Sequence, residues 1–135
     1  MKNNSSKIDL NLIRKMNSLS AHRGPDSSNF VVKEKYALGA NRLAIVDADN
    51  FSANQPFKKN NIYVVFNGEI YNYKSLKKIL VDKNFVNFDT DCDTEVILEL
   101  YKLLGIDFIN KLEGMFSICI FDQNTNKIFL IRDRM

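Results

Sequence analysis

The sequence predicts a mixed fold of helices and strands, of the α+β class, in which a sheet is covered by helices or packed on a second sheet. Several segments place apolar residues at the helical period behind capping residues. Others are short β-branched or aromatic runs bounded by turn residues. The run Met115 to Phe121 is apolar at most positions, which predicts a strand buried on both faces. A chain of 135 residues is long enough for one such domain and its core.

The first elements are a helix and two extended segments. Asp9 can cap a helix whose apolar residues follow the 3.6 period, and Gly24-Pro25 ends it. Those apolar residues are Leu12, Ile13, Met16 and Leu19. Asn29 to Val32 and Tyr36 to Val46 are then expected to be extended, the second with a break in its alternation at Asn41-Arg42.

The middle of the chain predicts a loop, a strand and a sharp turn. Asp47 to Gln55 is polar and reads as a loop, whereas Ile62 to Phe66 is β-branched and aromatic. Asn67-Gly68 follows directly and is a strong signal for a tight turn or hairpin. Asn72 can then cap a helix from Tyr73 to about Lys83.

The last third predicts a second amphipathic helix and a hairpin. Asp93 can cap this helix, and Gly105 ends it. The residues expected to face inward are Leu76, Ile79 and Leu80 in the first helix, and Val96, Ile97, Leu100, Tyr101 and Leu104 in the second. A short helical turn at Asp107 to Lys111 precedes the strand Met115 to Phe121, which a turn joins to Ile128 to Ile131.

Composition excludes several classes of partner. With 45% hydrophobic and 26% charged residues and a net charge of +3, the chain is typical of soluble globular proteins. The lysines of Lys74 to Lys78 fall at helical spacing, which favours a solvated helix face over a nucleic-acid surface. No apolar run is long enough for a bilayer, and Lys2 to Lys7 lacks a signal-peptide core, so we expect a cytoplasmic protein without a membrane partner. Cys92 and Cys119 form no disulfide or metal-ligand pattern.

Four residues together suggest a site for a free amino acid. Arg42 lies in an otherwise apolar strand, where a guanidinium is costly without an anionic partner such as a carboxylate. Asp93 at a helix start could hold an ammonium group. Asn67 and Gly68 offer a side-chain amide and a backbone N–H, the donors of an oxyanion hole. Such a pocket would take an α-amino acid whose side-chain carbonyl is attacked, and glutamine fits this description.

Three of these four residues, and a further string, also have a purely structural interpretation. Asn67-Gly68 can be only a turn, and Asp93 only a helix cap. His22-Arg23-Gly24-Pro25-Asp26 can be only a helix stop, in which Arg23 pairs with Asp26. Cys92 lies beside Asp93, but without a base its thiol stays mostly protonated, and no sequence argument brings His22 to it.

Seven strings resemble, in order, the class II glutamine amidotransferase domain of glutamine-hydrolysing asparagine synthetases. They are His22-Arg23-Gly24-Pro25-Asp26, Asn41-Arg42-Leu43-Ala44-Ile45-Val46-Asp47, Asn54-Gln55-Pro56, Asn67-Gly68-Glu69-Ile70-Tyr71-Asn72-Tyr73, Asp93-Thr94-Glu95-Val96-Ile97-Leu98, Gly114-Met115-Phe116 and Arg132-Asp133-Arg134. This resemblance implies an N-terminal-nucleophile hydrolase fold, a four-layer αββα sandwich of two antiparallel sheets.

The resemblance also implies roles for the site residues. Arg42 would bind the α-carboxylate of glutamine, and the residues after it would line the pocket: Leu43, Ala44, Ile45 and Val46. Asp93 would hold the α-ammonium group, Asn67 and Gly68 would form the oxyanion hole, and Glu69 would adjoin the substrate. No metal or cofactor is implied in this domain. ATP and Mg²⁺ would serve a synthetase domain, which would use the released ammonia to convert aspartate to asparagine.

Both ends of the chain differ from the family pattern. In the family the mature chain starts with a cysteine whose α-amine serves as the base, whereas this chain begins Met1-Lys2. It stops at Met135, before the strand and the synthetase domain that would follow. The expectation is therefore a partial amidotransferase domain over residues 1–135, without the first strand, the C-terminal part or the nucleophile. Such a chain would be inactive alone and poorly soluble, because the missing strand would leave an edge and apolar residues uncovered.

Two alternatives remain open at this point. The chain could be a non-catalytic module that binds glutamine or another protein without turnover. It could instead be the amidotransferase part of a synthetase that amidates sugar acids for surface polysaccharides, since similar domains occur there.

Overall fold

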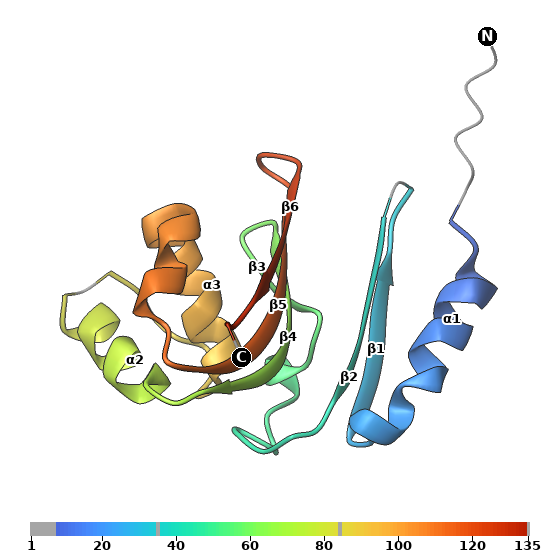
Figure 1. The fold of residues 1–135 in the computed structure, drawn as a ribbon, viewed down its shortest axis with the longest axis horizontal. Coiled ribbons are helices and arrows are strands. Elements are labelled where there is room, and N and C mark those ends of the chain that lie inside the picture. The colour runs from blue at the N-terminus through green and yellow to red at the C-terminus, as the bar shows by residue number, and fades with distance from the viewer. Residues whose placement is uncertain (1–7, 35, 84, 135) are drawn as a thin grey trace, which may run out of the picture.

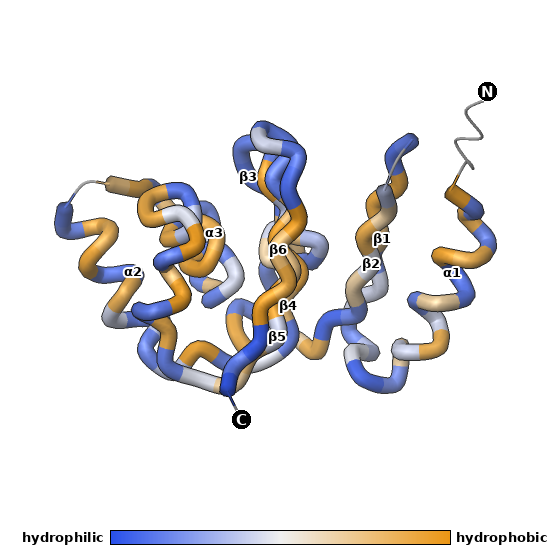
Figure 2. Tube along the Cα trace, turned by 45° about the horizontal axis from the view of Figure 1, so that its top comes forward, coloured by the Kyte–Doolittle hydropathy of each residue, from blue (hydrophilic) through white to orange (hydrophobic). Residues whose placement is uncertain are grey.

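The computed structural model describes residues 8–34, 36–83 and 85–134 of the chain, and these form four layers (Figures 1 and 2). Helix α1 (Leu10–Leu19) covers a two-stranded sheet, which faces a four-stranded sheet whose far side carries α2 (Tyr73–Asp82) and α3 (Asp93–Leu104). The expectation about a missing nucleophile falls on Met1 to Lys7, which lie outside the described residues. Within the described part of the chain, no helix has the length and apolar character needed to cross a membrane.

The two-stranded sheet and α1 form the small layer. The carboxylate of Asp9 caps α1 as predicted, because it accepts the N–H of Asn11 at 2.8 Å. Strands β1 (Ser27–Val32) and β2 (Ala37–Arg42) pair antiparallel. The prediction that the second strand continues to Val46 is wrong. Arg42 is its last residue, and the guanidinium folds onto the carbonyl oxygens of the residues that follow.

The four-stranded sheet has the order β3–β4–β5–β6 and is antiparallel throughout. Its strands are β3 (Phe57–Lys59), β4 (Ile62–Ile70), β5 (Gly114–Asp122) and β6 (Lys127–Arg132). The sequence analysis missed β3. Its hairpin with β4 turns at Asn60-Asn61, whose φ angles of 50° and 62° suit a two-residue turn.

The predicted turn at Asn67-Gly68 is wrong, because both residues lie inside β4. Gly68 has a φ of 144°, and a Cβ there would collide with the main-chain oxygen of Met115 on the neighbouring strand. The glycine is therefore needed for the close approach of β5 to β4 and not for a chain reversal.

One face of this sheet and the two helices on it enclose the hydrophobic core. Its buried members come from β3 to β5, α2, α3 and the 3₁₀ helix Gly105–Lys111: Phe57, Ile62, Val64, Phe66, Ile70, Leu80, Val96, Ile97, Leu98, Leu100, Tyr101, Phe108, Phe116, Ile118 and Ile120. Helix α3 is buried on all sides from Asp93 to Tyr101, so the prediction that it is amphipathic is wrong. The inward predictions also fail for Ile79 and Leu104, which are exposed.

Two smaller predictions are corrected as well. The side chain of Asn72 does not cap α2 but bridges the Lys111 carbonyl and the Glu113 N–H. Strand β5 is not buried on both faces along its length: Met115 is exposed, whereas Phe121 on the same face is buried. The difference arises because Tyr36, next to the small sheet, packs its ring against Phe121 at 4.3 Å.

Candidate functional site

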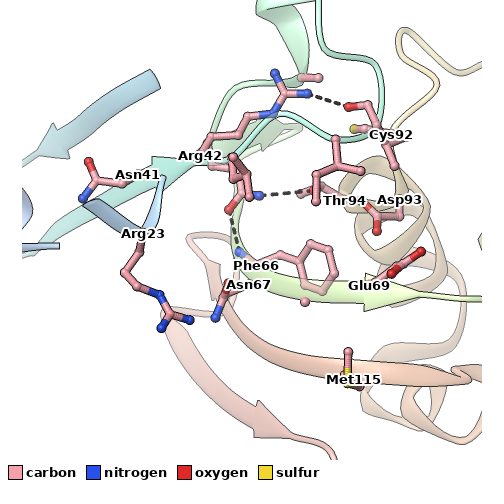
Figure 3. Close-up of a pocket in the computed structure, with 16 residues that line it drawn as sticks. Arg23, Asn41, Arg42, Phe66, Asn67, Glu69, Cys92, Asp93, Thr94 and Met115 are labelled. Carbon is pink, nitrogen blue, oxygen red and sulfur yellow. Dashed lines mark hydrogen bonds between the residues drawn. The ribbon is translucent and has the colours of Figure 1, made fainter. Parts of the chain in front are cut away.

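A pocket of about 300 Å³ opens where the small layer meets the four-stranded sheet (Figure 3). Its walls are the end of β2 with the loop after it, the middle of β4, and the start of α3. The lining residues are Arg23, Asn41, Arg42, Leu43, Ile45, Val46, Ala53, Gln55, Phe66, Asn67, Gly68, Glu69, Cys92, Asp93, Thr94 and Met115.

Arg42 lies on one wall and is largely buried. Its Nη2 donates to the carbonyl oxygens of Val46 at 2.7 Å and Asp47 at 3.0 Å, and its Nη1 donates to Asn54 Oδ1 at 3.2 Å. Two main-chain carbonyls and one side-chain amide thus accept hydrogen bonds from the guanidinium. The sequence had suggested an anion as its partner. Since a guanidinium carries five N–H donors and Arg42 still lines the pocket, it retains the capacity to bind a ligand carboxylate.

The edge of β4 forms the second wall and carries an open N–H group. The backbone N–H groups of Phe66 and Ile70 point away from β5: the first donates to Gln55 Oε1 at 2.7 Å, and the second lies 3.5 Å from Asp93 Oδ2. Alternation along an antiparallel strand directs the N–H of Gly68 to the same edge. Strand β3 pairs only with Ile62–Val64, so no residue of β3 lies opposite Gly68, and this N–H faces the pocket that Gly68 lines.

Two carboxylates, those of Asp93 and Glu69, line the same pocket as Arg42. Asp93 is the first residue of α3 and is buried; burial raises its pKa, the N–H of Ile70 counteracts this in part, and the charge of Glu69 raises it further. Glu69 is exposed and follows Gly68 on β4. A pocket lined by a guanidinium and two carboxylates suits a ligand with both a carboxylate and an ammonium group.

A buried ionic network supports the loop that leads into Asp93. The carboxylate of Glu95 is fully buried and accepts the N–H groups of Asp89 and Thr90, the Thr90 hydroxyl and the ammonium of Lys59. The next N–H, that of Asp91, donates to Asp47 Oδ2 at 2.8 Å. These bonds connect the loop before α3 to the loop after β2, so they hold two walls of the pocket together.

The structure brings eight of the nine predicted site residues to the pocket. The exception is Ala44, whose N–H donates to Asp26 Oδ2 at 2.7 Å. The structural alternative for Asp26, a pair with Arg23, is therefore wrong: Asp26 braces the loop after β2, and Arg23 lines the pocket. The roles that the resemblance assigns to these residues stay predictions.

The two candidate reactive side chains do not meet. Cys92 lines the pocket, but it is buried, and this burial raises the pKa of its thiol. His22 is exposed and is not a lining residue. The structure therefore offers Cys92 no histidine base, in agreement with the low weight that the sequence gave to this pair.

Several lining residues carried no role in the sequence analysis. Gln55 and Thr94 belong to strings quoted for the resemblance, and Gln55 is one of the buried polar residues. In the sequence, the available signal for Gln55 was an amide directly before a proline. For Thr94 the sequence held no such signal, because its hydroxyl gains a role only when α3 packs against Gln55 and accepts a hydrogen bond from it. Among the described residues, no group of three or more His, Cys, Asp or Glu side chains is arranged to hold a metal ion.

Comparison with known proteins identifies relatives of the whole chain. A family model described as a glutamine amidotransferase domain matches residues 1–135. "Asparagine synthetase [glutamine-hydrolyzing] 2" of Bacillus subtilis is 41% identical over 132 residues, which are 96% of this chain and 17% of that protein. "Amidase chry2" of Gibberella zeae is 38% identical over 120 residues, 86% of this chain and 17% of its own length. The chain thus spans about a fifth or less of these curated relatives.

A solved structure is similar as well. The glutamine phosphoribosylpyrophosphate amidotransferase of B. subtilis, complexed with ADP and GMP, superposes with a TM-score of 0.62 at 26% identity. The match covers 76% of this chain and 24% of that one.

Proposed function

Because this chain belongs to the family of glutamine amidotransferase domains, we propose that its pocket binds free glutamine and directs the side-chain carbonyl to the edge of β4. Its two antiparallel sheets between helices are those of the N-terminal-nucleophile hydrolase fold, which the amidotransferase neighbour shares. The observation that carries the proposal is the open N–H of Gly68, which faces the same pocket as a guanidinium and two carboxylates.

In this proposal the two charged groups on the α-carbon of glutamine each meet an opposite charge. The guanidinium of Arg42 binds the α-carboxylate, while Asp93 and Glu69 bind the α-ammonium group. The side-chain carbonyl then accepts from the N–H of Gly68, with the amide of Asn67 as a second donor. Leu43, Ile45 and Val46 line the pocket beside Arg42. These donors would stabilise negative charge on the carbonyl oxygen when a nucleophile attacks the amide carbon.

We do not assign the nucleophile to Cys92. Its thiol is buried and its raised pKa keeps it protonated near neutral pH, and a protonated thiol is a poor nucleophile. We therefore expect this polypeptide alone to bind glutamine without hydrolysing it.

The relatives support a proposal about the wider role. Glutamine-hydrolysing asparagine synthetases are among them, so we propose that the domain serves ammonia supply for conversion of aspartate to asparagine. The amidotransferase domain would then work with a synthetase domain that uses ATP and Mg²⁺. No cofactor would be bound in the amidotransferase domain itself.

Calorimetry with glutamine tests the proposal through Asp93. We expect Asp93→Asn, which keeps the shape but removes the charge, to weaken glutamine binding about tenfold or more. Because the folded pKa of Asp93 is raised, the wild-type carboxylate loses its charge at a higher pH than an ordinary Asp. Wild-type affinity should therefore begin to fall earlier on acidification, and Asp93→Asn should lose this part of the pH dependence.

The matched control is Asp82→Asn, which removes an exposed carboxylate from α2 outside the pocket. This variant should bind glutamine as the wild type does. Absence of glutamine binding in the folded wild type, or equal binding by Asp93→Asn, would overturn the proposed site.

A further inference from the structure

We propose that Gln55 is a positioning residue, which holds the edge of β4 so that the N–H of Gly68 stays open to the ligand. This inference rests on the proposed function, because it concerns how the same pocket receives the side-chain carbonyl of glutamine.

The first observation is where β3 begins. Its register pairs Phe57 with Val64, and continuing that register would place Gln55 opposite Phe66. Strand β3 begins only at Phe57, two residues after Gln55, so no main-chain carbonyl of β3 is paired with Phe66. The side-chain Oε1 of Gln55 accepts the Phe66 N–H instead, at 2.7 Å (Figure 3). An amide side chain thus replaces the last main-chain acceptor of the strand.

The second observation is what this replacement leaves uncovered. A continued β3 would have brought its backbone along the edge toward Gly68 and closed it. With Gln55 in its place, the edge is satisfied at Phe66 and approached by Asp93 at Ile70, while the N–H between them faces the pocket. The side chain of Gln55 accepts from the Phe66 N–H and leaves the N–H of Gly68 uncovered.

The third observation is that Gln55 also contacts the opposite wall. Its Nε2 lies 3.4 Å from Thr94 Oγ1, one residue beyond Asp93 on α3. Gln55 is buried, and each of its two amide atoms has a partner within the protein. It therefore connects the edge that would bind the ligand carbonyl with the helix start that would bind the ligand ammonium group, and it fixes the distance between the two.

The test separates positioning from stability by using two ligands. Norvaline has the α-carboxylate, the α-ammonium group and an apolar side chain, but no carbonyl for Gly68. We measure the affinity of the wild type and of Gln55→Met for glutamine and for norvaline by calorimetry. A misplaced Gly68 N–H should weaken glutamine binding about five- to tenfold and leave norvaline nearly unchanged, so that the preference for glutamine is lost.

The matched control is Asn72→Leu. Asn72 also bridges two backbone groups with its amide, at 2.9 Å and 3.2 Å, but it lies outside the pocket. We expect this variant to lose stability while it keeps the wild-type preference for glutamine. Equal weakening of both ligands in Gln55→Met would mean that Gln55 is only structural and would overturn the proposal. If the wild type prefers glutamine but Gln55→Met keeps that preference, the positioning role fails while the glutamine site stands.

A second test uses the wild type alone, so it does not require that Gln55→Met folds. Amide hydrogen exchange without ligand should be slow at Phe66 and fast at Gly68, and glutamine should slow it at Gly68. Protection of Gly68 before any ligand is added would show a closed edge and contradict the inference. Failure of the wild type to bind glutamine at all would overturn both this inference and the function on which it rests.

Discussion

The two sides of the pocket are built in different ways. On the side of the four-stranded sheet, α2 and α3 bury a continuous apolar core, whereas the buried core residues include none from α1 or β1. The small layer instead exposes the apolar side chains of its helix: Leu12 is 54% exposed, Met16 59% and Leu19 69%. Figure 2 shows apolar stretches along α1, which lies on the far side of the small sheet from the four-stranded sheet.

Polar contacts hold the small layer instead. Asn17 is buried and donates to Ser28 Oγ at 2.9 Å, and Asn41 donates to the Asn17 carbonyl at 2.6 Å. The layer contacts Phe121 of the large sheet through Tyr36, and Arg42 bonds to Asn54 in the loop before β3. A pocket that takes Arg42 from this layer and Gly68 from the large sheet depends on both, so its affinity should be sensitive to the weaker one.

The largest effect should come from the apolar core. Phe108 is fully buried and packs edge-on against Tyr101, so Phe108→Ala should lower the free energy of unfolding by about 4 kcal/mol. Leu19→Ala on α1 removes an exposed side chain and should change it by less than about 0.5 kcal/mol. Urea denaturation followed by circular dichroism measures both. If both variants lost a similar free energy of unfolding, α1 would be packed as tightly as the core, and the difference between the two layers would not hold.

The next effect concerns the ionic network behind α3. Lys59 lies 2.7 Å from Glu95 and 3.1 Å from Glu99, two buried carboxylates. Lys59→Met would leave both charges without this cation and should cost about 3 kcal/mol. Lys77→Met is the control, because its partner Asp91 is 87% exposed and water can replace the ammonium group. The control should therefore lose much less stability.

The pH dependence sharpens this prediction. Burial alone would lower the pKa of Lys59, but hydrogen bonds to Glu95, Glu99 and Asp89 raise it above its ordinary value. A raised lysine pKa contributes stability that is complete below the unfolded pKa and is lost only as the pH rises through the folded one. The difference between wild type and Lys59→Met should thus stay constant from about pH 7 to about pH 9. A difference that shrinks across this range would show that the ammonium is not held by the network.

The same contrast explains what the sequence could predict. Local signals sufficed for the helices, for β5 with β6, and for the cap at Asp9, because capping and periodicity act within a few residues. The short strand β3 carries too few residues for a pattern. Asn67-Gly68 misled because the same dipeptide that favours a turn also permits a close strand approach, and only the partner strand decides between them.

Burial was the least predictable property. Periodicity identified an apolar face on α1, but no described segment buries most of it. It missed the burial of Glu95 and Glu99, since a carboxylate in the core requires Lys59, a residue far away in the sequence. The site residues were found mainly through the resemblance, whereas Gln55 gains its significance only from the place where β3 begins.

The smallest expected effect tests the small layer itself. Asn17→Ala removes the bond to Ser28 and should loosen the contact between α1 and β1 by about 1 kcal/mol, which speeds amide exchange in β1 and β2 about fivefold. Exchange in β4 and β5 should not change, because the core stays intact. Ser18→Ala is the control, since that hydroxyl bonds only to the Lys15 carbonyl on the exposed side of α1. If instead both sheets exchange faster together, the two layers unfold as one unit. If only the small layer loosens, glutamine affinity should fall by up to the same factor, because Arg42 ends β2 and moves with it.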